Sequence, residues 1–167
     1  SDRDYFYKAV LWAVENGITS GSSQTTFGPD LTSTRAQMVT FLWRAAGSPA
    51  PVTAVTPFQD VTSGDYYYEA VLWAVENGIT AGTSPTTFGS DDTVTRGQAM
   101  TFLYRAAGSP SVTGSSFGDV PASAYYADAV AWAVSHGITS GTGTDTFSPN
   151  SPCTRAQIVT FLYRDRV

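Results

Sequence analysis

The sequence is poor in the residues and segments on which several common functions depend. It contains one cysteine, Cys153, so no intrachain disulfide can form, and that lack alone leaves the compartment open. It contains no run of about 18 apolar residues, which a membrane-spanning helix would need. The residues from Ser1 onward do not resemble a signal peptide. No membrane insertion is therefore expected.

Positive charge is also scarce, and most of it recurs at regular intervals. Nine lysines and arginines face 14 aspartates and glutamates, which gives a formal net charge of −5. This balance argues against nucleic acid or anionic lipid as a partner. Six of the nine basic residues are arginines at a repeated spacing: Arg35, Arg44, Arg96, Arg105, Arg155 and Arg164. Such a pattern suits a few discrete acidic groups better than a polyanion.

The chain is a threefold repeat. Trp12, Trp73 and Trp132 are separated by 61 and 59 residues, and the arginines keep the same offsets. Self-similarity at a fixed period marks a repeat architecture. We therefore divide the chain into units at 1–49, 50–110 and 111–167, of which the first lacks the Phe-x-Asp segment that opens the other two. The sequence is accordingly expected to begin inside a repeat of a longer protein.

Each repeat is predicted to contain two helices joined by a polar loop. The first helix should cover residues 5–16, 66–77 and 125–136, where alanines and valines recur at helical spacing and a glycine follows. A loop rich in Gly, Ser and Thr follows, with one phenylalanine as its anchor. The second helix carries an apolar stripe at i, i+3, i+4 and i+7. The predicted fold class is all-α.

The second helix opens with a four-residue box, Thr34-Arg35-Ala36-Gln37, that returns at residues 95–98 and 154–157. A threonine with a glutamine three residues later is the sequence form of a capping box. The arginine stands at the first helical position, where free backbone N–H groups make a cation unfavourable by up to about 1 kcal/mol. Three copies of this choice predict that guanidinium and free amides together bind an anionic group.

These motifs together resemble the S-layer homology module, three times and over nearly the whole chain. The resemblance rests on Phe-x-Asp-Val, paired tyrosines, Ala-Val-x-Trp-Ala, Asn-Gly-Ile-x-x-Gly, Phe-x-Pro and Thr-Arg-Ala-Gln-x-x-x-Phe-Leu-x-Arg. It implies three modules folded as a pseudo-threefold spindle around a central helix bundle. It also implies a non-catalytic anchor on the bacterial surface. Such anchors bind secondary cell-wall polysaccharide in grooves between repeats, typically through a ketal-pyruvylated N-acetylmannosamine.

The resemblance further implies which residues contact the saccharide. The arginine of the box is the family's principal contact and maps here to Arg35, Arg96 and Arg155. The candidate ligand-binding set adds two acidic residues, the glutamine of each box and one loop glycine of each repeat: Asp60, Asp119, Gln37, Gln98, Gln157, Gly21, Gly82 and Gly141. The boxes end in glutamine where the family often has glutamate, which leaves the grooves less acidic.

Several of these residues have a structural interpretation that the sequence leaves open. The box arginines could form internal ion pairs that brace neighbouring repeats. Asp60 and Asp119 could anchor the loop before the first helix instead of contacting a sugar. The repeated tryptophans could stack on sugars, but their helical spacing among alanines and valines favours the core. Arg44, Arg105 and Arg164 are expected to be solvated or paired at the helix end, where a cation suits the helix dipole.

The predicted function is binding, without catalysis, of an anionic cell-wall polysaccharide outside the cell, at the bacterial surface. No cofactor or metal site is indicated, and the lone histidine, His136, stands where the other repeats have Asn16 and Asn77. The alternative is a protein-interaction or S-layer lattice module that self-associates or holds a partner protein. A third interpretation makes the chain the anchor of a larger polypeptide whose catalytic part lies outside residues 1–167.

Overall fold

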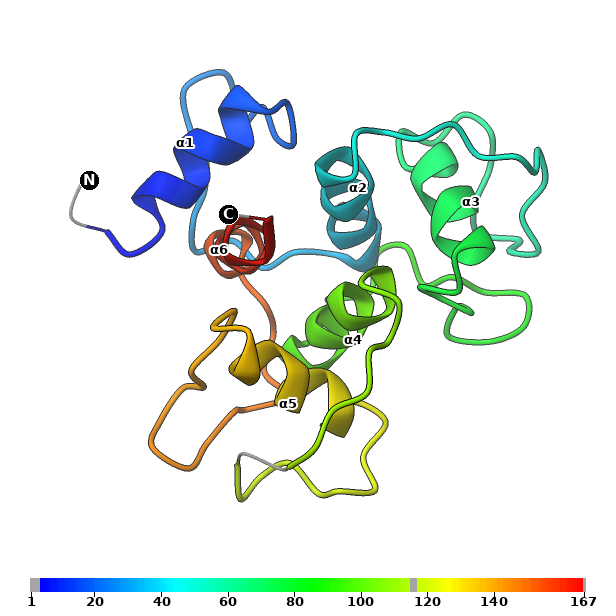
Figure 1. Ribbon diagram of the computed structural model, residues 1–167. Helices are drawn as coiled ribbons and strands as arrows, with labels where there is room; N and C mark the ends of the chain where they lie inside the picture. Colours follow the sequence, from blue (N-terminus) through cyan, green and yellow to red (C-terminus); the bar gives the residue numbers. More distant parts are fainter. Residues whose placement is uncertain (1–3, 115–116, 167) are drawn as a thin grey trace.

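The computed structural model describes residues 4–114 and 117–166, which form six α-helices and no β-strand (Figure 1). The first helix of each repeat is short: α1 (Tyr7–Glu15), α3 (Tyr68–Glu76) and α5 (Ala127–Ser135). The second helix is longer: α2 (Arg35–Ala45), α4 (Arg96–Ala106) and α6 (Arg155–Arg166). The all-α prediction is confirmed for these residues, with two helices and a connecting loop in each repeat.

The long helices begin where the boxes predict. At the start of α2 the Thr34 hydroxyl accepts the backbone N–H of Gln37 at 3.2 Å, and the Gln37 side-chain oxygen accepts the backbone N–H of Thr34 at 3.2 Å. Helices α4 and α6 have the same reciprocal pair of bonds. The predicted capping boxes are therefore confirmed in all three repeats.

The short helices begin two residues later than predicted, because a turn of aromatic residues precedes them. The N–H of Tyr68 donates to the carbonyl of Asp65, three residues back, at 3.0 Å. The rings of Tyr66 and Tyr67 meet edge to face with centroids 5.0 Å apart. The predicted glycine stop is confirmed, since Gly78, which follows the C-cap residue Asn77 of α3, has a left-handed φ of 66°.

The three long helices lie at the centre, and each short helix packs against the long helix of another repeat. Helix α3 packs against α2, α5 against α4, and α1 against α6 (Figure 1). Each repeat thus places its first helix on the repeat before it, and α1 closes the ring by packing on the last repeat. The unit that repeats in sequence is therefore not the unit that packs.

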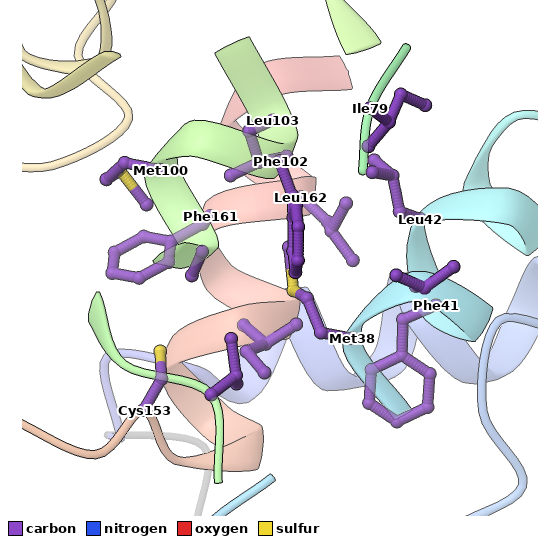
Figure 2. Packing of buried hydrophobic residues seen from close by; sticks show 14 of the residues in the cluster. Met38, Phe41, Leu42, Ile79, Met100, Phe102, Leu103, Cys153, Phe161 and Leu162 are labelled. Carbon is purple, nitrogen blue, oxygen red and sulfur yellow. The ribbon is translucent and has the colours of Figure 1, made fainter. Parts of the chain in front are cut away.

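Side chains from the long helices meet in one apolar core (Figure 2). Its equivalent leucines, Leu42, Leu103 and Leu162, are at most 1% exposed. Burying a leucine side chain contributes about 1.5–3 kcal/mol relative to leaving it in water. The stability of the fold therefore resides largely in the central bundle, to which every repeat contributes one helix.

Backbone hydrogen bonds close a ring at the N-terminal ends of the long helices. The N–H of Ser33 donates to the Cys153 carbonyl at 3.0 Å, Cys153 donates to Val94 at 2.9 Å, and Val94 donates back to Ser33 at 2.9 Å. The ring gives the molecule the pseudo-threefold arrangement that the family resemblance implies.

Burial raises the pKa of the Cys153 thiol to about 12, so the thiol stays protonated and unreactive.

The first repeat differs on the outer face of its short helix. Tyr7, Leu11 and Val14, which we call the α1 stripe, are 39%, 44% and 51% exposed, whereas Leu72, the counterpart of Leu11, is 3% exposed. In the second repeat the linker that precedes the short helix runs along it. Phe58 of that linker lies beside Val75, the counterpart of Val14. Within the described residues, no such segment covers the α1 stripe.

Candidate functional site

Three surface grooves lie between the repeats, and each has one box arginine in its wall. We name them by that residue: the Arg35 groove of about 390 Å³, the Arg96 groove of about 300 Å³ and the Arg155 groove of about 370 Å³. These volumes lie at the small end of the range for ligand pockets, about 300–1,000 Å³. Each groove therefore suits a small ligand or the end of a larger one.

Every groove takes residues from all three repeats. The Arg35 groove combines Arg35 from the first repeat, the 80–83 loop and helix α4 from the second, and Tyr125 from the third. The Arg96 groove is built from the equivalent residues one repeat further along the chain, and Tyr5 of the first repeat takes the place of Tyr125. The Arg155 groove is built from the equivalent residues one repeat further again, and Tyr66 of the second repeat takes that place. The grooves therefore exist only in the assembled ring.

The box arginines are buried and held in place before any ligand binds. Arg35, Arg96 and Arg155 are 4%, 3% and 6% exposed. Their Nε–H groups donate, at 2.9–3.0 Å, to the carbonyl of one loop phenylalanine each: Phe88, Phe147 and Phe27. Each guanidinium also lies over that phenylalanine ring and over a second one from a long helix, with Cζ 4.7–5.6 Å from the centroids. These contacts fix its position.

None of these arginines forms an ion pair with a carboxylate in the described part of the chain. The ion pair found among those residues joins Arg166 to Asp165. No aspartate or glutamate lines the three grooves. Burial lowers the pKa of each box guanidinium, yet arginine stays charged in proteins. A buried cation without a counter-ion is unfavourable, and an anion entering the groove would relieve that cost. The ion-pair interpretation is wrong for these residues.

The backbone amides at the start of each long helix are occupied, contrary to the prediction. In α2 the N–H groups of Arg35 and Ala36 donate to the carbonyls of Asp92 and Ser90 at 2.9 and 3.1 Å, and the capping threonine takes the next N–H. Helices α4 and α6 insert in the same way into the loop of another repeat. Buried N–H groups require partners, and this insertion supplies them. An anion in one of the grooves would therefore meet side chains and not these amides.

The glutamine of each box lines a different groove from the arginine of the same box. Gln98 lies in the Arg35 groove, Gln157 in the Arg96 groove and Gln37 in the Arg155 groove. Residues two apart on a helix point about 200° apart, so one box serves two neighbouring grooves. The side-chain oxygen of each glutamine is engaged in the cap, which leaves the NH₂ group as its hydrogen-bond donor toward the groove.

The three candidate glycines also line the grooves, at positions that demand glycine. Gly21, Gly82 and Gly141 have φ values of 95°, 81° and 84°, in the left-handed region that other residues avoid. A Cβ atom on Gly82 would lie 2.5 Å from the Phe58 ring and from the Thr87 carbonyl. The loop backbone therefore approaches the core closely where it forms the groove.

Asp60 and Asp119 do not line a groove. The Asp60 carboxylate accepts the N–H groups of Phe88 and Gly89 at 2.8 Å each, and Asp119 makes matching bonds in the third repeat. Burial alone would raise the pKa of Asp60, but these N–H groups lower it. Because the Phe88 carbonyl holds Arg35, Asp60 positions that arginine through the backbone. The structure shows these two aspartates in the loop-anchoring role that the sequence left open, and the loop that they hold lies between the two helices of the repeat.

The model of the S-layer homology domain matches the chain three times, at residues 1–39, 57–100 and 116–159. The chain belongs to the S-layer homology family. It is similar to a cell surface protein of Thermoanaerobacter kivui, with 34% identity over 117 residues that cover 66% of this chain and 15% of the relative. It is also similar to a surface-layer 125 kDa protein of Lysinibacillus sphaericus, with 30% identity over 118 residues that cover 70% of this chain and 10% of the relative.

The S-layer homology chain thus spans a small part of both relatives. Domains of this family in surface proteins are known for cell-wall anchoring, and both relatives are surface proteins by name. The chain is accordingly assigned to the cell surface or cell wall.

Sequence reasoning missed a second arginine in each groove of this S-layer homology chain. Arg105 lines the Arg35 groove, Arg164 the Arg96 groove and Arg44 the Arg155 groove. Each donates from Nη1, at 3.1 Å, to the carbonyl of the buried isoleucine that follows a short helix. A signal was present, because Gln37, Phe41 and Arg44 stand at i, i+4 and i+7 on one helix face. Each groove therefore holds two guanidinium groups.

The remaining candidates lie away from the grooves. Trp132 is 3% exposed and the other two repeated tryptophans pack half-buried against the core, which confirms the core interpretation. His136 caps α5 and contacts the Trp132 carbonyl, as its asparagine counterparts do. Within residues 4–114 and 117–166 there is no group of metal-binding side chains, and none of the helices there has the length and apolarity needed to span a bilayer.

Proposed function

We propose that this S-layer homology chain anchors a protein to the cell wall, without catalysis, by binding an anionic secondary cell-wall polysaccharide in its inter-repeat grooves. The observation that carries the proposal is a buried guanidinium on the wall of each groove, with no carboxylate to neutralise it among the described residues. The bound group is a pyruvylated amino sugar, because a pyruvyl ketal brings one carboxylate into each groove.

The chemistry of the grooves suits such a sugar. A planar guanidinium can donate two parallel hydrogen bonds to one carboxylate, which fixes orientation as well as charge. Threonine hydroxyls, the glutamine amide and the loop backbone offer partners for sugar hydroxyl and acetamido groups. Tyr5, Tyr66 and Tyr125 stand at the groove edges, 62–63% exposed, where an aromatic ring can cover the apolar face of a sugar.

The test is calorimetric titration of purified wall polymer, with and without its pyruvyl groups, into wild type and Arg96→Ala. Loss of a charge-assisted hydrogen bond costs about 1.5–3 kcal/mol, so we expect roughly 10- to 100-fold weaker binding at that groove. Removal of the pyruvyl groups should weaken wild type similarly. Lys8→Gln, which removes a positive charge from an exposed position outside every groove, is the matched control. Equal affinity of all proteins for both polymers would refute the mechanism.

A protein-interaction or S-layer lattice module that self-associates is the second candidate, because one relative is a surface-layer protein by name. Light scattering of the purified chain over a range of concentrations, without glycan, tests this role. Concentration-dependent assembly without glycan would support it. A monomer at every concentration would leave saccharide binding as the function.

A further inference from the structure

Two further pockets open on the surface beside the grooves. We call them the Phe58 pocket, of about 590 Å³, and the Phe117 pocket, of about 630 Å³. The Phe117 pocket is lined by Phe117, Val134, Gly137, Thr139, Ser140 and Arg164, and each of these residues has its counterpart 59 residues earlier in the Phe58 pocket. The pocket is therefore a repeated feature of the second and third repeats.

Each of these pockets is continuous with one groove. The Phe58 pocket and the Arg35 groove share Thr80, Ala81 and Arg105 in their walls. The Phe117 pocket and the Arg96 groove share the three equivalent residues of the third repeat. One arginine side chain and two loop residues thus form the boundary between groove and pocket, so a ligand that fills the groove borders the pocket.

We propose that each of the two pockets binds the uncharged sugar residue that is linked to the acidic one in the adjoining groove. A polysaccharide residue is joined to its neighbours by glycosidic bonds, so a neighbour has to lie where the groove opens. Both pocket volumes fall within the range for ligand sites, about 300–1,000 Å³. This inference rests on the proposed function, because it extends the same saccharide beyond the groove.

The arginine at the boundary can serve both sides. The Nη1 of Arg105 donates to the Ile79 carbonyl at 3.1 Å, and Arg164 makes the same bond to Ile138. A guanidinium carries five N–H donors, and neither arginine forms an ion pair among the described residues. One bond thus holds the side chain in place, and donors remain for a hydroxyl or acetamido oxygen. Since this arginine is the sole charged residue lining either pocket, the sugar bound there needs no charge.

The rest of the pocket suits the apolar face of a sugar ring. Phe58 and Phe117 form the floor, 4% and 8% exposed, and each packs on the loop phenylalanine of its repeat with ring centroids 5.7 Å apart. Val75 and Val134, both half-buried, form one side. Removing C–H groups of a sugar from water against such a surface is favourable. The pocket therefore combines an apolar floor with one fixed donor group.

The test uses the whole chain and two oligosaccharides released from purified wall polymer. One is the pyruvylated monosaccharide, and the other is the trisaccharide with the pyruvylated residue at its centre, so that both neighbours are present. Calorimetry should show that wild type binds the trisaccharide at least tenfold more tightly, because a hydrogen bond to a charged group and apolar contacts are added. Equal affinities would overturn the pocket assignment and leave the proposed function standing. No binding of either ligand would overturn both.

A double variant tests whether the gain comes from the pockets. Val75→Gln with Val134→Gln replaces an apolar side of each pocket by a longer polar side chain, and thermal melts check that the protein folds. The ratio of the two affinities should fall toward one. Val14→Gln, at the counterpart position in the first repeat and outside both pockets and all three grooves, is the matched control and should keep the wild-type ratio. An unchanged ratio in the double variant would overturn the assignment.

A second measurement needs no variant. In wild-type protein with ¹³C-labelled valine methyl groups, the signals of Val75 and Val134 should shift when the trisaccharide is added and stay in place with the monosaccharide. The signal of Val14 should move with neither ligand. Trisaccharide binding that leaves Val75 and Val134 unshifted would show that the neighbouring sugars lie elsewhere and would overturn the proposal.

Discussion

At the scale of single residues, Asp119 lies outside every groove yet fixes a residue inside one. Its carboxylate accepts the N–H of Phe147 at 2.8 Å, and the Phe147 carbonyl accepts the Nε–H of Arg96 at 2.9 Å. Asp60, Phe88 and Arg35 form the same series in the neighbouring repeat. The aspartate of the Phe-x-Asp segment therefore fixes the position of an arginine side chain through the backbone of one loop phenylalanine.

We expect Asp119→Asn to weaken saccharide binding several-fold and to lower the melting temperature by a few degrees. The amide keeps one acceptor oxygen but loses the negative charge that strengthens both bonds to the loop. Binding is measured by titration of the pyruvylated polymer, and stability by circular dichroism. Asp128→Asn, at a carboxylate of α5 outside the three grooves, is the control and should leave saccharide binding unchanged.

The same substitution should also change the pH dependence of stability. The Phe147 and Ser148 N–H groups hold the pKa of Asp119 below its ordinary value of 3.8. A carboxylate with a lowered pKa stabilises the fold above its unfolded pKa and loses that contribution as pH falls through the folded value. Wild type should therefore lose more stability than Asp119→Asn below about pH 4. Parallel melting curves across this range would show that the carboxylate does not hold the loop.

At the scale of helices and loops, local features could be predicted from the sequence and long-range ones could not. The boxes gave the starts of the long helices, because a cap depends on residues three apart. The short helices began late, because nothing in the local pattern separates the aromatic turn at Tyr66 from the helix itself. Gly97 stands where the other two boxes have alanine, and a Cβ there would lie 3.0 Å from the Tyr126 ring, a contact that the local sequence does not reveal.

The sequence predicted some of the residues that line the grooves, but not the partners of those residues. Arg35 was identified as an anion-binding group, but its backbone N–H donates to Asp92, which is 57 residues away. No sequence pattern predicted that the backbone N–H groups at the helix start would donate to carbonyls of another repeat. The separation of Arg35 and Gln37 into two grooves follows from helix geometry, but the groove that each one enters depends on how the repeats close into a ring.

The uncovered α1 stripe leads to a prediction at the same scale. Placing Pro-Phe-Gln-Asp-Val, the sequence of residues 57–61, directly before Ser1 keeps the repeat offset of 61 residues. We expect the added phenylalanine to pack beside Val14 and Phe27, and the added aspartate to bind the N–H groups of the Phe27 loop. Burying one phenylalanine contributes about 1.5–3 kcal/mol, so the midpoint of urea unfolding should rise.

The control extension replaces the added phenylalanine and aspartate by serine and should leave the unfolding midpoint where it was. If the first repeat uses its loop as the second does, the complete extension should also tighten the Arg155 groove, because it supplies the support that Phe27 lacks. An extended protein that unfolds at the same urea concentration as its serine control would show that the α1 stripe does not accept this segment.

At the scale of the whole molecule, positive charge is concentrated where the repeats meet. The chain carries a formal net charge of −5, yet six of its nine basic residues line the three grooves in pairs. Concave sites lined by one sign of charge concentrate field lines and attract oppositely charged ligands. The acidic exterior also disfavours binding of polyanions along the surface, which agrees with the proposal that the ligands are discrete acidic substituents.

Because each groove draws on three repeats, no repeat should bind saccharide by itself. A chain of independent sites that lost residues 111–167 would keep part of its binding capacity. Here that loss removes Tyr125 from the Arg35 groove, the loop from the Arg96 groove and the arginine from the Arg155 groove. It also removes α6, on which α1 packs. We therefore expect the 1–110 fragment to bind no pyruvylated polymer.

Mixing the two fragments should restore the fold and the sites together. Helix α5 packs on α4 and α6 packs on α1, so a 111–167 fragment has docking surfaces at both ends of the 1–110 fragment. The break falls in a linker whose residues 109–111 are exposed, where a free chain end is tolerated. Circular dichroism and titration of the equimolar mixture should recover most of the wild-type helix content and binding stoichiometry. Two-thirds of the wild-type stoichiometry in the 1–110 fragment alone would instead mean that each repeat carries a complete site.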